Sequence, residues 1–423
     1  MSQVRPALLR RALLVLVAAL SVATLPALPA AAQSGCTPAG GQAIPGPSTI
    51  PAGDFVVIGG GWGHGVGMSQ YGAQGAAKLG CTAQQILQTY YQGVTIGQAP
   101  VLPESVRVSL WPERPGGAPV PAICIRAHTG APAWQPPEGD ALTQPTGSLW
   151  RVDVLVDGSY TIRQFDSVDG CRNAGTSGTG TEVWSGGSAG QLLRVPLDGT
   201  PIVQLTSKST NATYPEGRPY AHGTMEFRSV AGAAGATTGS TYLTLQIDTH
   251  EGRNALERYL RGLSEMPSSW EPAALQAQAI TGRSYAQDKW ESFKGSRSGC
   301  HCDVYDSTSD QVYAGYIKES EPGYGHRWVA AVDATAGQTM RYDGDTAVGY
   351  YSSSHGGHSE SNAFVWGSNA VAYLKPVDDS RWDLASPNPL RRWATALTKE
   401  QVGQAFGVGV ATSVTLPEPR GAA

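Results

Sequence analysis

The stretch that decides the fold is LRGLSEMPSSW at residues 260–270, which runs into ALQAQA at residues 274–279. It places one carboxylate, Glu265, in a short apolar turn just before a helix rich in small residues. Leu263, Met266, Pro267 and Trp270 surround that carboxylate in the sequence. An apolar surround disfavours the charged form of an acid and raises its pKa, as a general acid working near neutral pH requires. A lone glutamate in a loop is more often an ordinary surface residue, so the rest of the chain must decide the case.

The segments on either side of this turn are predicted to be helical. Asn254 is a suitable N-cap for a short helix over residues 255–260. A longer helix follows and reaches about residue 294, with Pro272 in its first turn, where a missing N–H costs nothing. Residues at i, i+4, i+7 and i+11 of this helix form a narrow face of mostly small side chains that lets a neighbour approach closely: Leu275, Ala279, Gly282 and Ala286.

The first 32 residues have the pattern of an export signal. A basic start is followed by an apolar run over residues 12–28 and by a small-residue cleavage site at residues 30–32. We therefore expect a secreted, extracytoplasmic protein, with an uncleaved membrane anchor as the alternative. Lys and Arg total 30 against 34 Asp and Glu, and no basic stripe indicates a nucleic-acid partner.

Six cysteines follow the signal segment, an even number that favours disulfides in an exported chain. Proximity in sequence suggests two pairs and leaves two residues that are separated only by His301. Those two either close a small ring or contribute, with His301, to a metal site, but their spacing does not match that of zinc sites. We predict that the protein holds no metal and no cofactor and that its cysteines form disulfides. These cysteines are Cys36, Cys81, Cys124, Cys171, Cys300 and Cys302.

The remaining chain indicates a mixed α+β fold with a large β-rich part. Residues 33–54 resemble a linker, and two short helices are predicted over residues 69–78 and 83–90. Alternating patterns predict strands across residues 104–250, with a hairpin turn at Asp157-Gly158. A buried strand is expected at residues 347–351, a last helix at about 398–405, and a frayed tail after residue 416.

Three polar loops, at residues 59–72, 303–315 and 352–360, carry side chains suited to an uncharged polar ligand such as a sugar. The glycine-rich loop at residues 59–72 lacks the Gly-Lys-Ser/Thr ending of a nucleotide-binding P-loop, so we expect no nucleotide. The loop at residues 352–360 has Ser and His neighbours but no Gly-x-Ser-x-Gly, which disfavours a serine hydrolase. Ser69 could equally be a helix cap. The candidates are His64, Ser69, Gln70, Gln311, Tyr313, Ser353, Ser354 and Glu360.

Together these segments resemble the stage II sporulation protein D and amidase-enhancer family of bacterial cell-wall proteins. The resemblance rests on YLRG at 259–262, EMP at 265–267, ALQAQA at 274–279, RSYA at 283–286, QVYAG at 311–315, the run 350–360, and GHGVGMSQYGA at 63–73. In the usual members the last of these motifs follows the others, whereas here it comes first. A circular permutation would explain that order. We then expect residues 55–97 to complete a core at 251–416, with the β-rich region at 98–250 enlarged by loops.

The resemblance implies a lytic transglycosylase that acts on peptidoglycan glycan strands, with Glu265 as the catalytic acid and base. The loop residues above would line the glycan groove, and His64 and Gln70 should lie beside Glu265 across about 200 residues of sequence. Gln276 and Arg283 would either orient Glu265 or lie on the helix surface, and Glu360 is the only plausible second carboxylate. The alternative is a non-catalytic module that binds glycan and enhances a cell-wall amidase.

Overall fold

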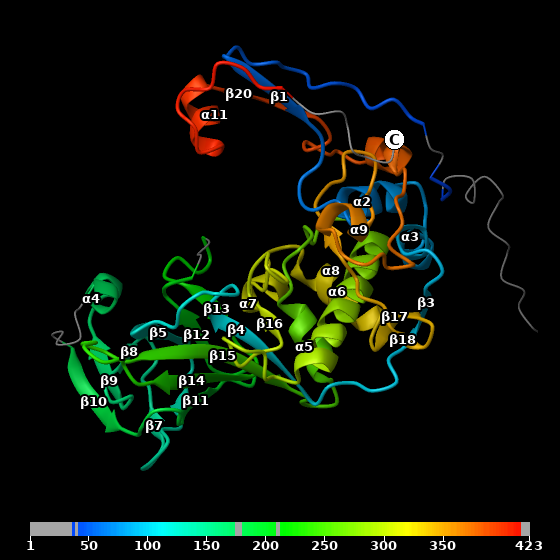
Figure 1. Cartoon of the computed structure of the whole chain (residues 1–423). Helices are drawn as coiled ribbons and strands as arrows, with labels where there is room; N and C mark the ends of the chain where they lie inside the picture. The colour runs from blue at the N-terminus through cyan, green and yellow to red at the C-terminus, as the bar shows by residue number, and fades with distance from the viewer. Residues whose placement is uncertain (1–35, 39–40, 174–179, 209–211, 416–423) are drawn as a thin grey trace, which may run out of the picture.

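The chain folds into a β-rich lobe and a helical lobe, as the computed structural model shows for residues 36–38, 41–173, 180–208 and 212–415 (Figure 1). The predicted signal segment and the end of the tail lie outside the described residues. Within the described ranges, none of the helices has the length and apolar character needed to cross a membrane.

The β-rich lobe is built from two sheets. One has the order β10-β9-β8-β5-β12-β13, with bounds Thr181–Gly186, Tyr160–Phe165, Leu149–Val154, Ala122–Thr129, Ile202–Leu205 and Arg218–Tyr220. The other has the order β11-β14-β15-β4-β16, with bounds Leu192–Pro196, Thr224–Val230, Ser240–Asp248, Ser105–Trp111 and Val304–Tyr305. Of the strand pairs described in these two sheets, only β16–β4 is parallel. The predicted hairpin is confirmed, since β8 and β9 pair antiparallel around Asp157 and Gly158, whose φ is +87°.

Aromatic side chains fill the space between these sheets. Trp134, from β6 (Ala133–Trp134, paired with β7, Leu142–Thr143), lies 5.4 Å from Trp150 of one sheet and 5.9 Å from Phe227 of the other, measured between ring centroids. All three rings are buried, and large aromatic surfaces contribute strongly to a core. The β-rich prediction for residues 104–250 is therefore confirmed as a two-sheet arrangement.

The helical lobe is organised around α6 (Pro272–Phe293), whose residues 274–287 are all buried except Gln276. Its predicted small-residue face is present, but neighbours cover it on several sides. A Cβ at Gly282 would lie 2.7 Å from the Leu263 side chain, which shows how closely the Glu265 segment approaches. The neighbours are α2 (Gln70–Lys78), α3 (Ala83–Tyr90), α5 (Ala255–Arg261), α8 (Gly325–Ala334) and β17 (Gln338–Tyr342).

The cap residues set the predicted helix starts. Ser69 caps α2, Thr82 forms a capping box with Gln85 at the start of α3, and Asn254 caps α5. The predicted final helix is α11 (Lys399–Ala405). Short helices elsewhere are α4 (Val168–Asn173), α7 (Tyr316–Glu319), α9 (Asn362–Trp366) and α10 (Ser380–Ala385).

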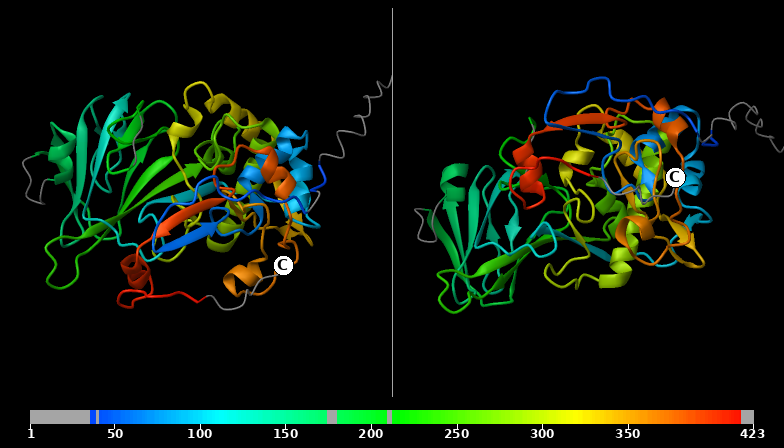
Figure 2. Two further views of the ribbon diagram at one scale, coloured as in Figure 1. Left: turned by 90° about the horizontal axis from the view of Figure 1, so that it is seen from above. Right: turned by 45° about the horizontal axis from the view of Figure 1, so that its top comes forward.

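The N-terminal segment packs against the C-terminal part of the chain. β1 (Phe55–Gly59) pairs with β20 (Trp393–Leu397), and the two form a ribbon (Figure 2). β2 (Met68–Ser69) pairs in parallel with β19 (Tyr351–Ser352), while β3 (Thr95–Gln98) pairs with β17, which also pairs with β18 (Asp345–Thr346). Residues 68–98 are therefore built into the helical lobe, whereas β1 pairs with β20 in a separate two-stranded ribbon. A circular permutation as the origin of this order stays a prediction.

Two local predictions need correction. Residues 347–350 were expected to be strand, yet only Tyr351 and Ser352 pair as one. Their backbone groups bind elsewhere: Ala347 N–H donates to the Met340 carbonyl and Val348 N–H to the Tyr373 hydroxyl. The predicted linker has no helix or strand over residues 41–54, but it is not detached, since Gly41 N–H donates to the Asp378 carboxylate.

The cysteines are arranged in the pairs that sequence proximity suggested. The Cα–Cα distances are 5.2 Å for Cys36–Cys81, 6.2 Å for Cys124–Cys171 and 5.2 Å for Cys300–Cys302. These distances lie within the range of disulfides. Cys300 and Cys302 are thereby joined to each other, and within the ranges that the structure describes no group of three or more His, Cys, Asp or Glu residues could hold a metal ion.

Candidate functional site

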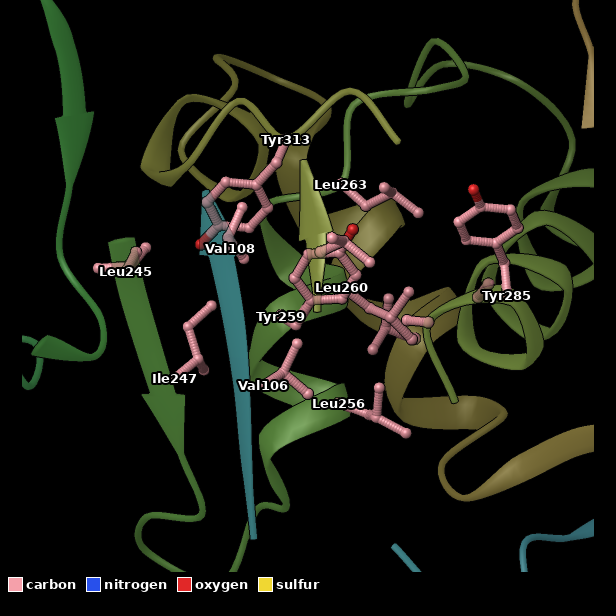
Figure 3. Close-up of a cluster of buried hydrophobic side chains, with 14 of the residues drawn as sticks. Val106, Val108, Leu245, Ile247, Leu256, Tyr259, Leu260, Leu263, Tyr285 and Tyr313 are labelled. Carbon is pink, nitrogen blue, oxygen red and sulfur yellow. The ribbon is translucent and has the colours of Figure 1, made fainter. Parts of the chain in front are cut away.

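The Glu265 turn lies against the segment at residues 311–314, at the junction of the two lobes. Ser264 N–H donates to the Val312 carbonyl at 2.8 Å, and Ala314 N–H donates to the Gly262 carbonyl at 2.8 Å. Gly262 is needed here because a Cβ would lie 2.4 Å from the Tyr313 ring. Apolar residues of β4, β15 and α5 pack together beneath the turn, and Leu263 of the turn itself belongs to the same cluster (Figure 3).

The predicted apolar surround of Glu265 is present, and it changes the acidity of the carboxyl group. Leu263 is fully buried and Met266 is 3% exposed, while Glu265 itself is partly buried. Burial raises the pKa of Glu265 from 4.5 to about 7. Three groups oppose that rise: the Val312 N–H, which donates to Oε1 at 2.6 Å, the Tyr351 hydroxyl and the Lys318 ammonium. Near neutral pH the group can therefore hold a proton and also release it.

A pocket of about 600 Å³ opens on one side of Glu265. Its size is that of a ligand site, and its wall combines segments that are distant in sequence. The lining residues are Trp62, Gly63, His64, Gln70, Glu265, Thr308, Asp310, Tyr351, Ser352 and Ser353. The structure thus places His64, Gln70 and Ser353 around one pocket with Glu265, as expected.

His64 and Gln70 are held by local contacts. His64 Nδ1 accepts a hydrogen bond from Val66 N–H at 3.1 Å, so its Nε2 carries the proton in the neutral ring. Burial lowers the pKa of His64, which favours that neutral form. Gln70 Nε2 donates to Gln278 Oε1 at 3.1 Å and ties the N-terminal segment to α6.

A second pocket of about 450 Å³ is also lined by Glu265. Lys318 of α7 is its cation; the side chain is 3% exposed and its Nζ donates to the Met266 carbonyl. Burial lowers the pKa of Lys318 to about 8. Its lining residues are Ser264, Glu265, Met266, Pro267, Ile317, Lys318 and Glu321. Glu265 therefore lines two pockets, which suits a ligand larger than one sugar unit.

Four predicted contact residues lie behind the pocket wall or beside it. Ser69 is fully buried and caps α2, which is the simpler of its two interpretations. Gln311 is fully buried, and its Nε2 donates to the Tyr351 hydroxyl at 2.9 Å. Tyr313 is 3% exposed and stacks on Tyr259 at 5.3 Å, and Ser354 is 1% exposed. Buried side chains of this kind support the wall without reaching a ligand.

Arg283 needs a larger correction. Its side chain is fully buried and forms two hydrogen bonds with Glu257, at 2.8 and 2.6 Å. It neither orients Glu265 nor lies on the helix surface, because a buried guanidinium requires a carboxylate partner and finds it on α5. Gln276 is partly exposed on α6 but lines neither pocket.

Glu360 is also not the second carboxylate of the pocket. It pairs through its backbone with the Val66 region and is absent from the lining. Asp310 takes that place, but its side chain is only 2% exposed. Its Oδ1 accepts from the Tyr285 hydroxyl at 2.7 Å, and its Oδ2 accepts from Arg297 at 2.5 Å and from Tyr305 N–H at 2.8 Å. Asp310 is therefore fully engaged in holding the fold.

A serine–histidine pair does occur at the pocket. His355 Nε2 lies 3.1 Å from Ser352 Oγ. Burial lowers the pKa of His355 to about 3, however, and its Nδ1 has no partner among the described residues. A base of such low pKa cannot take a proton from serine near neutral pH, and no carboxylate orients the ring. The serine hydrolase interpretation therefore has no support in the geometry.

Sequence reasoning missed several residues of the site. Tyr351 and Trp62 belong to motifs that were recognised, so a search for aromatic residues there could have found them. Thr308 and Asp310 lie in the polar loop at residues 303–315, from which only Gln311 and Tyr313 were predicted as contacts. Lys318 lies in a segment without a distinctive pattern. Their role depends on how the loops at 303–318 fold back on the Glu265 turn.

Part of the chain is similar in sequence to known proteins. Residues 252–342 match the family model described as Stage II sporulation protein. An amidase enhancer of Bacillus subtilis is 34% identical over 139 residues, 33% of this chain and 16% of that protein. Stage II sporulation protein D of Bacillus amyloliquefaciens is 31% identical over 169 residues, 38% of this chain and 48% of that protein.

The B. subtilis stage II sporulation protein D is 32% identical over 146 residues, 31% of this chain and 40% of that protein. The chain thus matches less than half the length of each of these relatives. No solved structure matches it. On the family model and these relatives, the domain at residues 252–342 belongs to the stage II sporulation protein D and amidase-enhancer family.

Proposed function

We propose that this protein is a peptidoglycan lytic transglycosylase, exported from the cytoplasm, with Glu265 as both general acid and general base. The observation that carries the proposal is one carboxyl group whose pKa is raised to about 7 and which borders two open pockets. Perturbed acids in clefts are candidates for catalysis. Three cysteine pairs are consistent with an oxidising compartment.

The reaction needs only one titrating group. Protonated Glu265 donates its proton to the glycosidic oxygen, and the C1–O bond breaks to leave a hydroxyl on the departing sugar. Ionised Glu265 then removes the proton from the C6 hydroxyl of the muramyl residue as O6 bonds to C1. The products are a 1,6-anhydro-muramyl end and a Glu265 that is protonated again.

An ordinary glycosidase would require a second available carboxylate. Asp310 is the other carboxylate that lines the pocket with Glu265, and both of its oxygens accept hydrogen bonds from the protein. An acid held in this way is a poor nucleophile and a poor base for water. Attack by the substrate's own hydroxyl therefore fits the site better than attack by water.

The test is product identification. Purified glycan strands, with and without stem peptides, are incubated with the mature chain, and the ends are analysed by mass spectrometry. We expect anhydro ends from the wild type and none above background from Glu265→Gln. Glu271→Gln is the matched control, because this neighbouring glutamate lines neither pocket. Equal product from wild type and Glu265→Gln would exclude Glu265 as the acid.

One relative favours a second candidate function. The B. subtilis protein with 34% identity is an amidase enhancer. Under this alternative the same pockets bind glycan without cleaving it, and the protein activates a cell-wall amidase. Adding an amidase to the same assay separates the two cases. Activation by both wild type and Glu265→Gln, without anhydro ends from either, would support the enhancer function.

A further inference from the structure

One backbone donor fixes the position of the Glu265 carboxyl group. Val312 N–H donates to Glu265 Oε1 at 2.6 Å, and the Val312 carbonyl accepts from Ser264 N–H at 2.8 Å. The two segments are thus joined in both directions. Any displacement of Val312 would move or release the carboxyl group.

The loop that carries Val312 is closed by an arginine from the β-rich lobe. Arg218, in β13, donates through Nη1 to both oxygens of Asp306, at 2.9 and 2.8 Å, and to the Tyr313 carbonyl at 2.7 Å. Asp306 also accepts from Tyr313 N–H at 3.2 Å. Arg218 therefore holds the start of the loop against its end, one residue beyond Val312.

This contact is buried, which gives it weight. The Asp306 side chain is fully buried, and that of Arg218 is 12% exposed. Lys208, from the loop after β12, is a second cation at 3.3 Å from Asp306. Charge-assisted hydrogen bonds are stronger than neutral ones, and a guanidinium group is planar and rigid. The β-rich lobe thus contacts the loop through ion pairs that solvent screens little.

We propose that Arg218 is a positioning residue for Glu265, through which the β-rich lobe sets the geometry of the general acid. The inference rests on the proposed function. Arg218 lies outside the segment that matches the family model, residues 252–342. The β-rich lobe is then a working part of the active site and not an appended module.

Loss of the Arg218 contacts with Asp306 and Tyr313 should change the pKa of Glu265 in a defined direction. The Val312 hydrogen bond favours the ionised form of Glu265, so weakening it raises the pKa of Glu265 above its present value of about 7. The other groups that act on Glu265 or share its pockets are Tyr351, Lys318, Tyr259, His64, Asp310 and Glu321. Of these, Asp310 lies in the same loop and is also held by Arg297, and the Tyr351 hydroxyl accepts from Gln311 of that loop. The shift therefore reports on the loop that carries Val312.

The experiment measures the titration of Glu265 directly. The carboxyl carbons of glutamate are labelled with ¹³C, and the Glu265 signal is assigned from its absence in Glu265→Gln. The variants are Arg218→Met and Arg218→Lys. The lysine variant keeps the positive charge but loses the planar guanidinium group. Arg126→Met is the control, because Arg126 lies in the same sheet and pairs with Glu216 at 2.6 Å.

We expect the Glu265 titration to move upward by about one pH unit in Arg218→Met and by less in Arg218→Lys, with no change in Arg126→Met. Production of anhydro ends should fall about tenfold in Arg218→Met, with its alkaline limb displaced in the same direction. If Arg218→Met does not fold, the Glu265 titration in Arg218→Lys alone tests whether Arg218 positions Glu265.

The outcomes separate this inference from the proposed function. An unchanged Glu265 titration in both Arg218 variants would overturn the inference, even if the wild type produces anhydro ends. If the Glu265 titration shifts in the Arg218 variants but the wild type produces no anhydro ends, Arg218 positions Glu265 and the protein is not a transglycosylase.

Discussion

Two glutamates, eight residues apart, differ in their partners and in their access to open space, one on α5 and the other in the turn that follows it. Glu257, on α5, faces the interior and pairs with Arg283 through two hydrogen bonds, at 2.8 and 2.6 Å. Glu265, after α5, has no ion-pair partner within 4.0 Å among the described residues and borders two pockets. A buried carboxylate with a matched cation stabilises the fold, whereas one without such a cation keeps a proton to donate.

The largest expected effect is on catalysis by Glu265. Removing its charge and proton in Glu265→Gln should lower the rate of anhydro-end formation by about 10²–10⁴-fold, the usual contribution of a general acid and base. The initial rate on purified glycan strands measures it. If the initial rate of Glu265→Gln is within threefold of the wild-type rate, Glu265 does not act as the catalytic acid and base.

The next effect concerns stability at the other glutamate. Glu257→Gln leaves Arg283 buried without its charge partner, so the free energy of unfolding should fall by about 3–5 kcal/mol. Urea denaturation followed by circular dichroism measures this loss. The activity per folded molecule should stay close to that of the wild type. A stable variant with low activity would instead indicate that Glu257 takes part in the chemistry.

A smaller effect follows from linkage between the pKa of Glu265 and folding. The pKa of Glu265 is about 7 in the fold against 4.5 in the unfolded chain, so the folded state binds more protons between these values and loses stability as the pH rises through them. Glu265→Gln avoids this loss. It should be more stable than the wild type by about 1–2 kcal/mol at pH 8, allowing for partial exposure, and equal to it near pH 4. Denaturation at both pH values provides the measurement, and an unchanged difference between them would contradict the raised pKa.

The smallest effect is expected at Tyr351. Its hydroxyl hydrogen bond favours the ionised form of Glu265, so Tyr351→Phe should raise the pKa of Glu265. We expect a loss of activity of only a few fold, since one hydrogen bond to a charged group is involved. The pH profile of the initial rate should extend to higher pH. A profile displaced to lower pH would show that Tyr351 acts differently.

Much of the fold could be predicted from local signals. Ser69, Thr82 and Asn254 mark helix starts because their side chains accept backbone hydrogen bonds that depend only on neighbouring residues. The hairpin at Asp157-Gly158 has an equally local cause. The pairing of residues 55–98 with the C-terminal part rested on motif order in a family, not on any local pattern.

The site was predictable only where a motif carried its residues. His64, Gln70 and Glu265 belong to recognised motifs, and they line one pocket. Arg283 was misassigned because helix periodicity cannot show that Glu257, 26 residues earlier, lies opposite it. Arg218 and Asp306 are 88 residues apart, one in β13 and the other directly after β16 of the second sheet, so their contact follows from tertiary packing alone.

The most direct test of Glu265 as the acid and base of an intramolecular reaction is digestion of purified glycan strands in H₂¹⁸O. We predict product ends that are lighter by one water than hydrolysed ends and that contain no ¹⁸O, because the nucleophile is the C6 hydroxyl of the substrate. These ends should be absent with Glu265→Gln. Product ends that carry ¹⁸O would show that water is the nucleophile and would contradict the proposed mechanism.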